Sequence, residues 1–137
     1  YHGEDFNKAL IETAQKLQYQ SGASVIVTGI KPNADTICNL FVDHQSAFLS
    51  ETPFTGTSFS GTGDLFSSVV IGAVLNGLDV IKGMMIAERF LGVAIADTVQ
   101  AGTSAIEGIH FEKHLSMLIQ ALQSPGSWHL TGDDFNE

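Results

Sequence analysis

The order of a helical pattern and a short apolar strand near the N-terminus limits the fold of this chain more than any other feature. Val25-Ile26-Val27 is β-branched and continuously apolar, which is typical of a strand covered on both faces. The helical pattern before it ends at Ser21-Gly22, and the apolar residues on one of its faces are Phe6, Leu10, Ala14 and Leu17. A helix that leads into such a strand is the unit of an α/β sheet, so we expect an α/β fold with a parallel sheet region.

The middle and end of the chain predict an antiparallel hairpin at the sheet edge and a set of packed helices. Residues 36–42 and 46–51 are predicted strands, and Asp43-His44-Gln45 forms the turn between them. Predicted helices cover residues 65–76, 79–101 and 111–122. The apolar face of the last helix is predicted from Phe111, Leu115, Leu118 and Leu122. We therefore expect one domain over residues 1–123 and a polar, acidic tail over residues 124–137.

The segment Gly61-Thr62-Gly63-Asp64 has the pattern of an anion site. It follows a turn-rich stretch and leads directly into an apolar helical run. Two glycines let the backbone approach a ligand, and a helix start offers unpaired N–H groups and the positive end of the dipole. A fixed carboxylate such as Asp64 would repel a phosphate, but it has a role if it accepts the proton of an alcohol that attacks the phosphate. The segment therefore indicates phosphoryl transfer with Asp64 as the base.

Each residue of this segment also has a purely structural interpretation. Asp64 can be an ordinary helix N-cap, which is a common role of aspartate. Gly61 and Gly63 can simply form a tight turn, although that same turn would be the anion cradle. Thr62 can set the shape of the loop, or its N–H can point at the transferred phosphate.

Thr28-Gly29 follows the apolar strand and is a second candidate for ligand contact. In open α/β sheets, ligands bind beyond the carboxyl ends of the strands, so a nucleotide contact is expected there. The alternative is that Thr28 satisfies backbone groups at the end of the strand.

The charge of the chain excludes several kinds of partner. Fifteen acidic residues against six basic ones give a net charge of −9, whereas nucleic acids and anionic membranes need a basic surface. A bound polyphosphate would have to be neutralised mainly by Mg²⁺ and backbone N–H groups. The single cysteine, Cys38, excludes an internal disulfide and fits a reducing compartment. With no visible signal peptide and no apolar run near the ~20 residues that span a bilayer, we expect a soluble cytoplasmic chain.

The histidines and Asp97 are further candidate site residues. Only His110 and His114 of the five histidines have helical i, i+4 spacing, and no third ligand stands nearby, so no protein metal site is expected. Asp97 lies in an apolar segment and needs a polar partner if it is buried. We interpret Asp97 as a structural hydrogen-bonding residue rather than a catalytic one.

Gly61-Thr62-Gly63-Asp64-Leu65-Phe66 resembles the anion-hole and catalytic-base motif of the ribokinase-like superfamily, in its pyridoxal (vitamin B6) kinase form. Sugar kinases of the superfamily more often have alanine between the glycines, and hydroxymethylpyrimidine kinases usually have cysteine at the position of Asp64. The resemblance covers roughly residues 6–122 and matches only the C-terminal half of the three-layer α/β/α kinase fold. With 137 residues that begin at Tyr1, the chain is expected to be a piece whose absent half holds the substrate pocket and lid.

The resemblance implies ATP-dependent phosphorylation of the 5′-hydroxyl of pyridoxal, pyridoxamine or pyridoxine, with Mg²⁺ bridging the phosphates. It implies that Asp64 is the base, that the N–H groups from Gly61 to Asp64 form the anion hole, and that the complete enzyme is a homodimer. At the ATP site it implies Thr28, Gly29 and Phe59. Where the family usually has a small polar residue, Gly29 offers no second hydroxyl, and Phe59 can equally be a core residue. The alternatives are a hydroxymethylpyrimidine or sugar kinase of the superfamily, or a non-catalytic nucleotide-binding α/β fragment.

Overall fold

The structure, a computed structural model, describes residues 4–124 and divides the chain into two compact units, Tyr1–Ser58 and Phe59–Glu137. Nearly all of the predicted acidic tail, residues 125–137, lies outside the described residues. No helix within residues 4–124 is long and apolar enough to cross a membrane.

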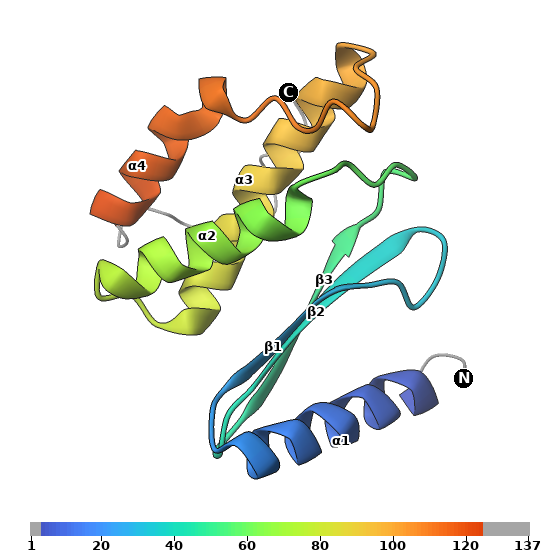
Figure 1. Cartoon of the computed structure of the whole chain (residues 1–137), viewed down its shortest axis with the longest axis vertical. Coiled ribbons are helices and arrows are strands. Elements are labelled where there is room, and N and C mark those ends of the chain that lie inside the picture. The colour runs from blue at the N-terminus through green and yellow to red at the C-terminus, as the bar shows by residue number, and fades with distance from the viewer. Residues whose placement is uncertain (1–3, 125–137) are drawn as a thin grey trace. The chain divides into compact units, whose positions relative to one another are not determined.

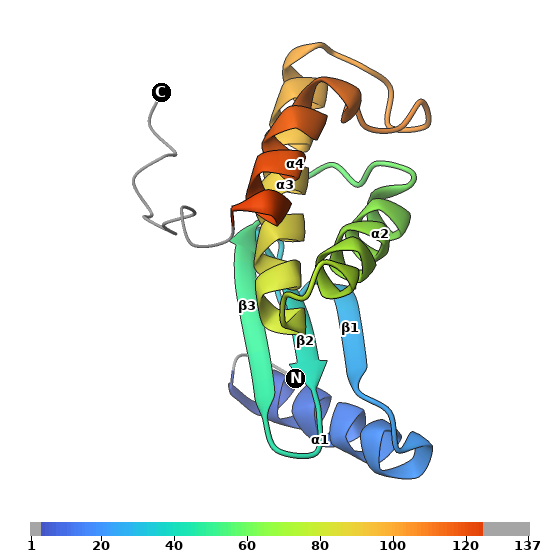
Figure 2. The same cartoon turned by 90° about the vertical axis from the view of Figure 1, so that its left-hand side faces the viewer.

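The first unit is a helix packed on a small sheet. The helix α1 (Glu4–Ser21) precedes the strands β1 (Val25–Ile30), β2 (Thr36–Val42) and β3 (Ala47–Pro53), which lie in the order β1-β2-β3. Figures 1 and 2 show α1 along one face of this sheet. The core of the unit consists of Ala14, Leu40 and Val42, with Leu10, Ile11 and Leu49 packed around them. The predicted helix and its inward residues Leu10 and Ala14 are thus confirmed, whereas Leu17 is half exposed.

Within the described residues, the first strand has an antiparallel partner only. β1 pairs antiparallel with β2, and the described residues contain no parallel pair. A parallel pair needs a crossover of a dozen or more residues, and the short connection between β1 and β2 is too brief for one. Among the described residues β1 lies at one edge of the sheet, with Val25, Ile26 and Val27 half-buried, and the buried central strand is β2.

The predicted edge hairpin is confirmed. β2 and β3 pair antiparallel from Thr36 opposite Pro53 to Val42 opposite Ala47. The Asp43 carboxylate accepts hydrogen bonds from the backbone N–H groups of Gln45 (2.8 Å) and Ser46 (2.7 Å), and these bonds lower the pKa of Asp43. The side chain of Asp43 therefore fixes the turn, which is a common role of aspartate.

The second unit consists of packed helices. These are α2 (Thr62–Leu75), α3 (Val80–Gln100), a 3₁₀ turn η1 (Glu112–His114) and α4 (Leu115–Gln123). α2 and α3 pack closely because α3 has Gly83 at their contact, where an added Cβ would lie 3.1 Å from the Cβ of Ala73. Asp79 caps α3, since its side chain accepts a hydrogen bond from the N–H of Lys82 at 2.8 Å.

The three predicted helices are present, but the predicted face of the last one is wrong in part. Leu115 is 40% exposed, whereas Ala121 is fully buried. The prediction assumed a continuous α-helix from Phe111. Residues 112–114 instead form a 3₁₀ turn, which has three residues per turn and so rotates the positions that follow it.

Candidate functional site

Gly61 opens α2 in a conformation that suits a ligand loop. It is the N-cap residue with φ of 83°, in the left-handed region where glycine alone is unstrained. No side chain among residues 4–124 caps this end of the helix. The N–H groups of Thr62, Gly63 and Asp64 therefore point out of the helix start without intrahelical carbonyl partners.

The two glycines of the loop differ in their conformation. Gly63 is an ordinary helical residue in the first turn of α2, with no positive φ. A Cβ added at Gly61 or at Gly63 would meet no atom within 4 Å, so the space beside both is open. At Gly63 the missing side chain, rather than an unusual backbone, is what leaves room for a ligand.

Asp64 is the third residue of α2 and not its cap. The interpretation of Asp64 as an N-cap is therefore wrong, because Gly61 occupies that position. The carboxylate is exposed, and no hydrogen bond or ion pair engages it within the described part of the chain. It is available to an incoming hydroxyl group.

A cavity of about 360 Å³ lies beside this loop, within the second unit. Ser60, Gly61, Asp64, Leu65 and Ser68 line one side, and Glu107, Gly108, Ile109, Phe111 and Glu112 line the other. Its size is at the lower end of the range for small-molecule sites. We call the second group, together with Ala105 and Ile106, the distal wall.

Sequence reasoning missed the distal wall. It consists of residues from the connection between α3 and η1 together with Glu112, the first residue of η1, and the only local signal in the connection was a pair of glycines, Gly102 and Gly108. The wall reaches the loop because Ser60 donates its N–H to the carbonyl of Ala105 at 3.1 Å. Gly108 has φ of 89°, and a Cβ there would lie 3.5 Å from the carbonyl oxygen of Ser60.

Comparison with known proteins shows the family of this chain. The sequence profile of the phosphomethylpyrimidine kinase family matches residues 4–108. The chain belongs to this family. Its place in the ribokinase-like superfamily, expected from the Gly61–Asp64 motif, is thereby confirmed. A search of curated protein sequences gives no match.

Two solved structures share the fold of this kinase-family chain. One is a pyridoxal kinase from Lactobacillus plantarum, with a TM-score of 0.71, 23% identity, and coverage of 85% of this chain and 43% of that chain. The other is a protein assigned as a phosphomethylpyrimidine kinase from Bacteroides thetaiotaomicron, with a TM-score of 0.68, 23% identity, and coverage of 85% and 41%. The chain thus spans about two fifths of the length of these structures.

Two of the predicted ATP-site residues of this kinase-family chain lie in the first unit. Thr28 is exposed beside an irregularity in the pairing of β1, which lies between Val27 and Ile30. Gly29 has φ of 69° and donates its N–H to the side-chain oxygen of Asn39 at 3.0 Å. That N–H group is therefore committed within the fold, and nucleotide contact by Thr28 and Gly29 stays a prediction.

Thr62 and Phe59 shape the start of the loop. The hydroxyl of Thr62 donates to the carbonyl of Phe59 at 2.7 Å, which agrees with the interpretation that Thr62 sets the loop's shape. The side chain of Phe59 is buried, as a core residue would be. Its place at a nucleotide site stays a prediction.

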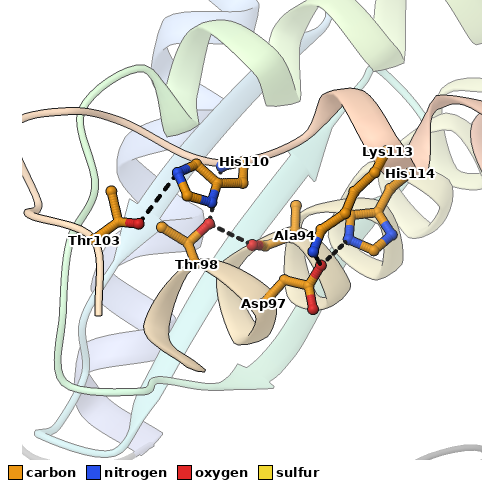
Figure 3. Close-up of polar contacts among 7 residues, drawn as sticks. All are labelled: Ala94, Asp97, Thr98, Thr103, His110, Lys113 and His114. Carbon is orange, nitrogen blue, oxygen red and sulfur yellow. Dashed lines mark hydrogen bonds and ion pairs between the residues drawn. The ribbon is translucent and has the colours of Figure 1, made fainter. Parts of the chain in front are cut away.

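The end of α3 is joined to residues within and directly after the distal wall by two polar clusters (Figure 3). The Asp97 carboxylate pairs with Lys113 and lies 2.7 Å from Nε2 of His114. Lys113, and after it His114, hold the pKa of Asp97 below its ordinary value. Asp97 therefore has polar partners, as expected if its role is structural hydrogen bonding. The adjacent Thr98 accepts the N–H of His110 at 2.9 Å.

His110 and His114 do not converge. The Nε2 of His110 is hydrogen-bonded to the hydroxyl of Thr103 at 3.1 Å, while His114 is bonded to Asp97. Across residues 4–124, no three histidine, cysteine, aspartate or glutamate side chains gather as a metal site would require.

Proposed function

We propose that these residues form the phosphate-binding loop and the base of an ATP-dependent kinase that phosphorylates the 5′-hydroxyl of pyridoxal, pyridoxamine or pyridoxine. The observation that carries the proposal is the exposed Asp64 carboxylate in the first turn of α2, beside the unpaired N–H groups of the helix start and at the edge of a cavity. Membership of a kinase family supports phosphoryl transfer as the reaction class.

The geometry suits an in-line attack of an alcohol on the γ-phosphate of ATP. Asp64 aligns the hydroxyl and accepts its proton as the new O–P bond forms. The N–H groups of Thr62, Gly63 and Asp64 stabilise the charge on the transferring phosphoryl group. Positioning of the two reactants contributes the rest, because little covalent chemistry is required of the protein.

The described residues fit a magnesium ion held chiefly by the nucleotide. Glu107 and Glu112 line the same cavity as Asp64, so a polyphosphate there faces three carboxylates and needs a cation. Mg²⁺ is commonly held by substrate phosphates with only one or two carboxylates. When bound, the ion would neutralise the phosphates, and Asp64 would remain free to act on the alcohol.

The choice between alcohols rests on one residue and one comparison. Asp64 with Leu65-Phe66 favours a B6 vitamer, because hydroxymethylpyrimidine kinases resemble this motif but usually have cysteine at the aspartate position. The match to the phosphomethylpyrimidine kinase family favours hydroxymethylpyrimidine as the second candidate.

A substrate panel tests the proposal. The complete protein that contains this chain is assayed with Mg²⁺-ATP against pyridoxal, pyridoxamine, pyridoxine, hydroxymethylpyrimidine and ribose. We expect the highest kcat/KM for a B6 vitamer. A higher value for hydroxymethylpyrimidine would replace the substrate assignment, and turnover of none of them would leave only a nucleotide-binding role.

A further inference from the structure

We propose that Asp97 and Thr98, neighbours near the end of α3, are positioning residues that hold the distal wall against the phosphate-binding loop. Neither residue lines the cavity. They act through the segment that follows α3, which they hold by contacts with His110, Lys113 and His114. The catalytic consequence of this link rests on the proposed function, whereas the link itself does not.

Thr98 provides the first attachment. It is fully buried, its hydroxyl donates to the carbonyl of Ala94 at 2.7 Å, and the same oxygen accepts the N–H of His110 at 2.9 Å. The hydroxyl thus uses its donor and an acceptor at once. Because His110 lies between the wall residues Ile109 and Phe111, this bond holds the wall at that point.

Asp97 provides the second attachment. Its carboxylate pairs with Lys113 and with Nε2 of His114, the last two residues of η1. Figure 3 shows these side chains converging on it. The wall residues Phe111 and Glu112 therefore lie between two fastened points, His110 and Lys113. Lys113 is 61% exposed, so water screens its ion pair with Asp97, and the less exposed His114 provides the more sheltered of the two contacts.

The wall in turn contacts the loop at Ser60. The N–H of Ser60 is bonded to Ala105, and Gly108 approaches the carbonyl of the same residue. Ser60 directly precedes Gly61, the N-cap of α2. A wall released at His110 and Lys113 would loosen Ser60 and, through it, the loop that presents the N–H groups. Displacements of about 1 Å in a reacting group can lower a rate by about a hundredfold.

Hydrogen exchange at Ser60 tests the link in the complete protein. Thr98→Val removes the acceptor of the His110 N–H. We expect the Ser60 amide to exchange about tenfold faster, because loss of one hydrogen bond lowers the local free energy of opening. Thr98→Ser keeps the oxygen and should restore protection. Thr13→Val is the matched control, because Thr13 makes the same hydroxyl bond to the carbonyl four residues earlier but fastens no loop.

Asp97→Asn gives a second route that does not depend on the buried site. Its matched control is Asp79→Asn, which also removes a carboxylate paired with a lysine but leaves a residue that can cap α3. We expect Asp97→Asn to speed exchange at Ser60 and Asp79→Asn to leave it unchanged. If Thr98→Val does not fold, Asp97→Asn decides the question.

The kinetic readout separates positioning from general stability. In Thr98→Val and in Asp97→Asn, kcat for the preferred alcohol should fall by about tenfold or more, while KM for that alcohol changes less. Both are measured at a temperature where the two variants are folded. Faster exchange at residues 105–110 with unchanged exchange at Ser60 would overturn the inference. Absence of phosphorylation by the wild-type protein would contradict the proposed function alone, and the exchange at Ser60 would then decide the inference.

Discussion

At the scale of single residues, the two glycines around Thr62 have separable roles. Gly61 is required by its left-handed backbone, while Gly63 is helical and only leaves space. Substitution by alanine should therefore have opposite effects on stability at the two positions.

We expect Gly61→Ala to lower the free energy of unfolding by about 1–2 kcal/mol, the cost of a left-handed non-glycine residue. Gly63→Ala should raise it by up to about 1 kcal/mol, because alanine favours a helix. Gly63→Ala should nevertheless weaken binding of Mg²⁺-ATP, since its Cβ enters the space beside the N–H groups. Urea unfolding and titration calorimetry measure the two effects. Equal destabilisation by both variants would contradict the assignment.

Asp64→Asn should lower kcat by roughly 10²–10⁴-fold, the usual contribution of a general base. Affinity for ATP should hold or improve, because a negative charge near the phosphates is removed. Glu107→Gln is the matched control, since it removes another carboxylate from the same cavity, and it should change kcat far less. Wild-type turnover by Asp64→Asn would exclude Asp64 as the base.

At the scale of elements, the joint between α3 and η1 should make stability depend on pH. The pKa of Asp97 is lowered in the folded state, so its contribution is complete above the unfolded value of about 3.9 and is lost as the pH falls through the folded value. Asp97→Asn should be less stable than wild type near pH 7, and the two should converge as the pH falls below the folded pKa of Asp97. Urea midpoints measured across this range check the sign. A difference that does not change with pH would contradict it.

Elements with local signals were predicted closely. The Asp43 side chain defines the hairpin turn, and Asp79 caps α3. Each of these boundaries is set by hydrogen bonds between residues two or three positions apart in the sequence. The antiparallel pairing of β1 with β2 depends on the short connection between them, and the rotated face of α4 depends on a 3₁₀ turn. Apolar periodicity reveals neither. The loop at Gly61 was found from its motif. The distal wall was missed because it meets Ser60 only through tertiary contacts.

At the scale of the whole molecule, the chain spans about two fifths of the solved structures that share its fold. Residues 1–137 alone should show no measurable phosphorylation of pyridoxal, because a phosphate-binding loop without a closed pocket cannot hold the alcohol in line with the γ-phosphate. The assay compares formation of pyridoxal 5′-phosphate by this segment and by the complete protein. Comparable specific activity would require a complete site within these residues.

The contact of α2 with α3 at Gly83 controls the direction of the N–H groups at the start of α2. The N–H groups that would meet a phosphate sit on the end of α2, and the tilt of α2 on α3 is set where Gly83 lies against Ala73 and Val70. A larger residue at position 83 would push the two helices apart and turn those groups away from their present direction. The direction of these N–H groups can therefore be altered at a buried helix contact, without replacing any residue that lines the cavity.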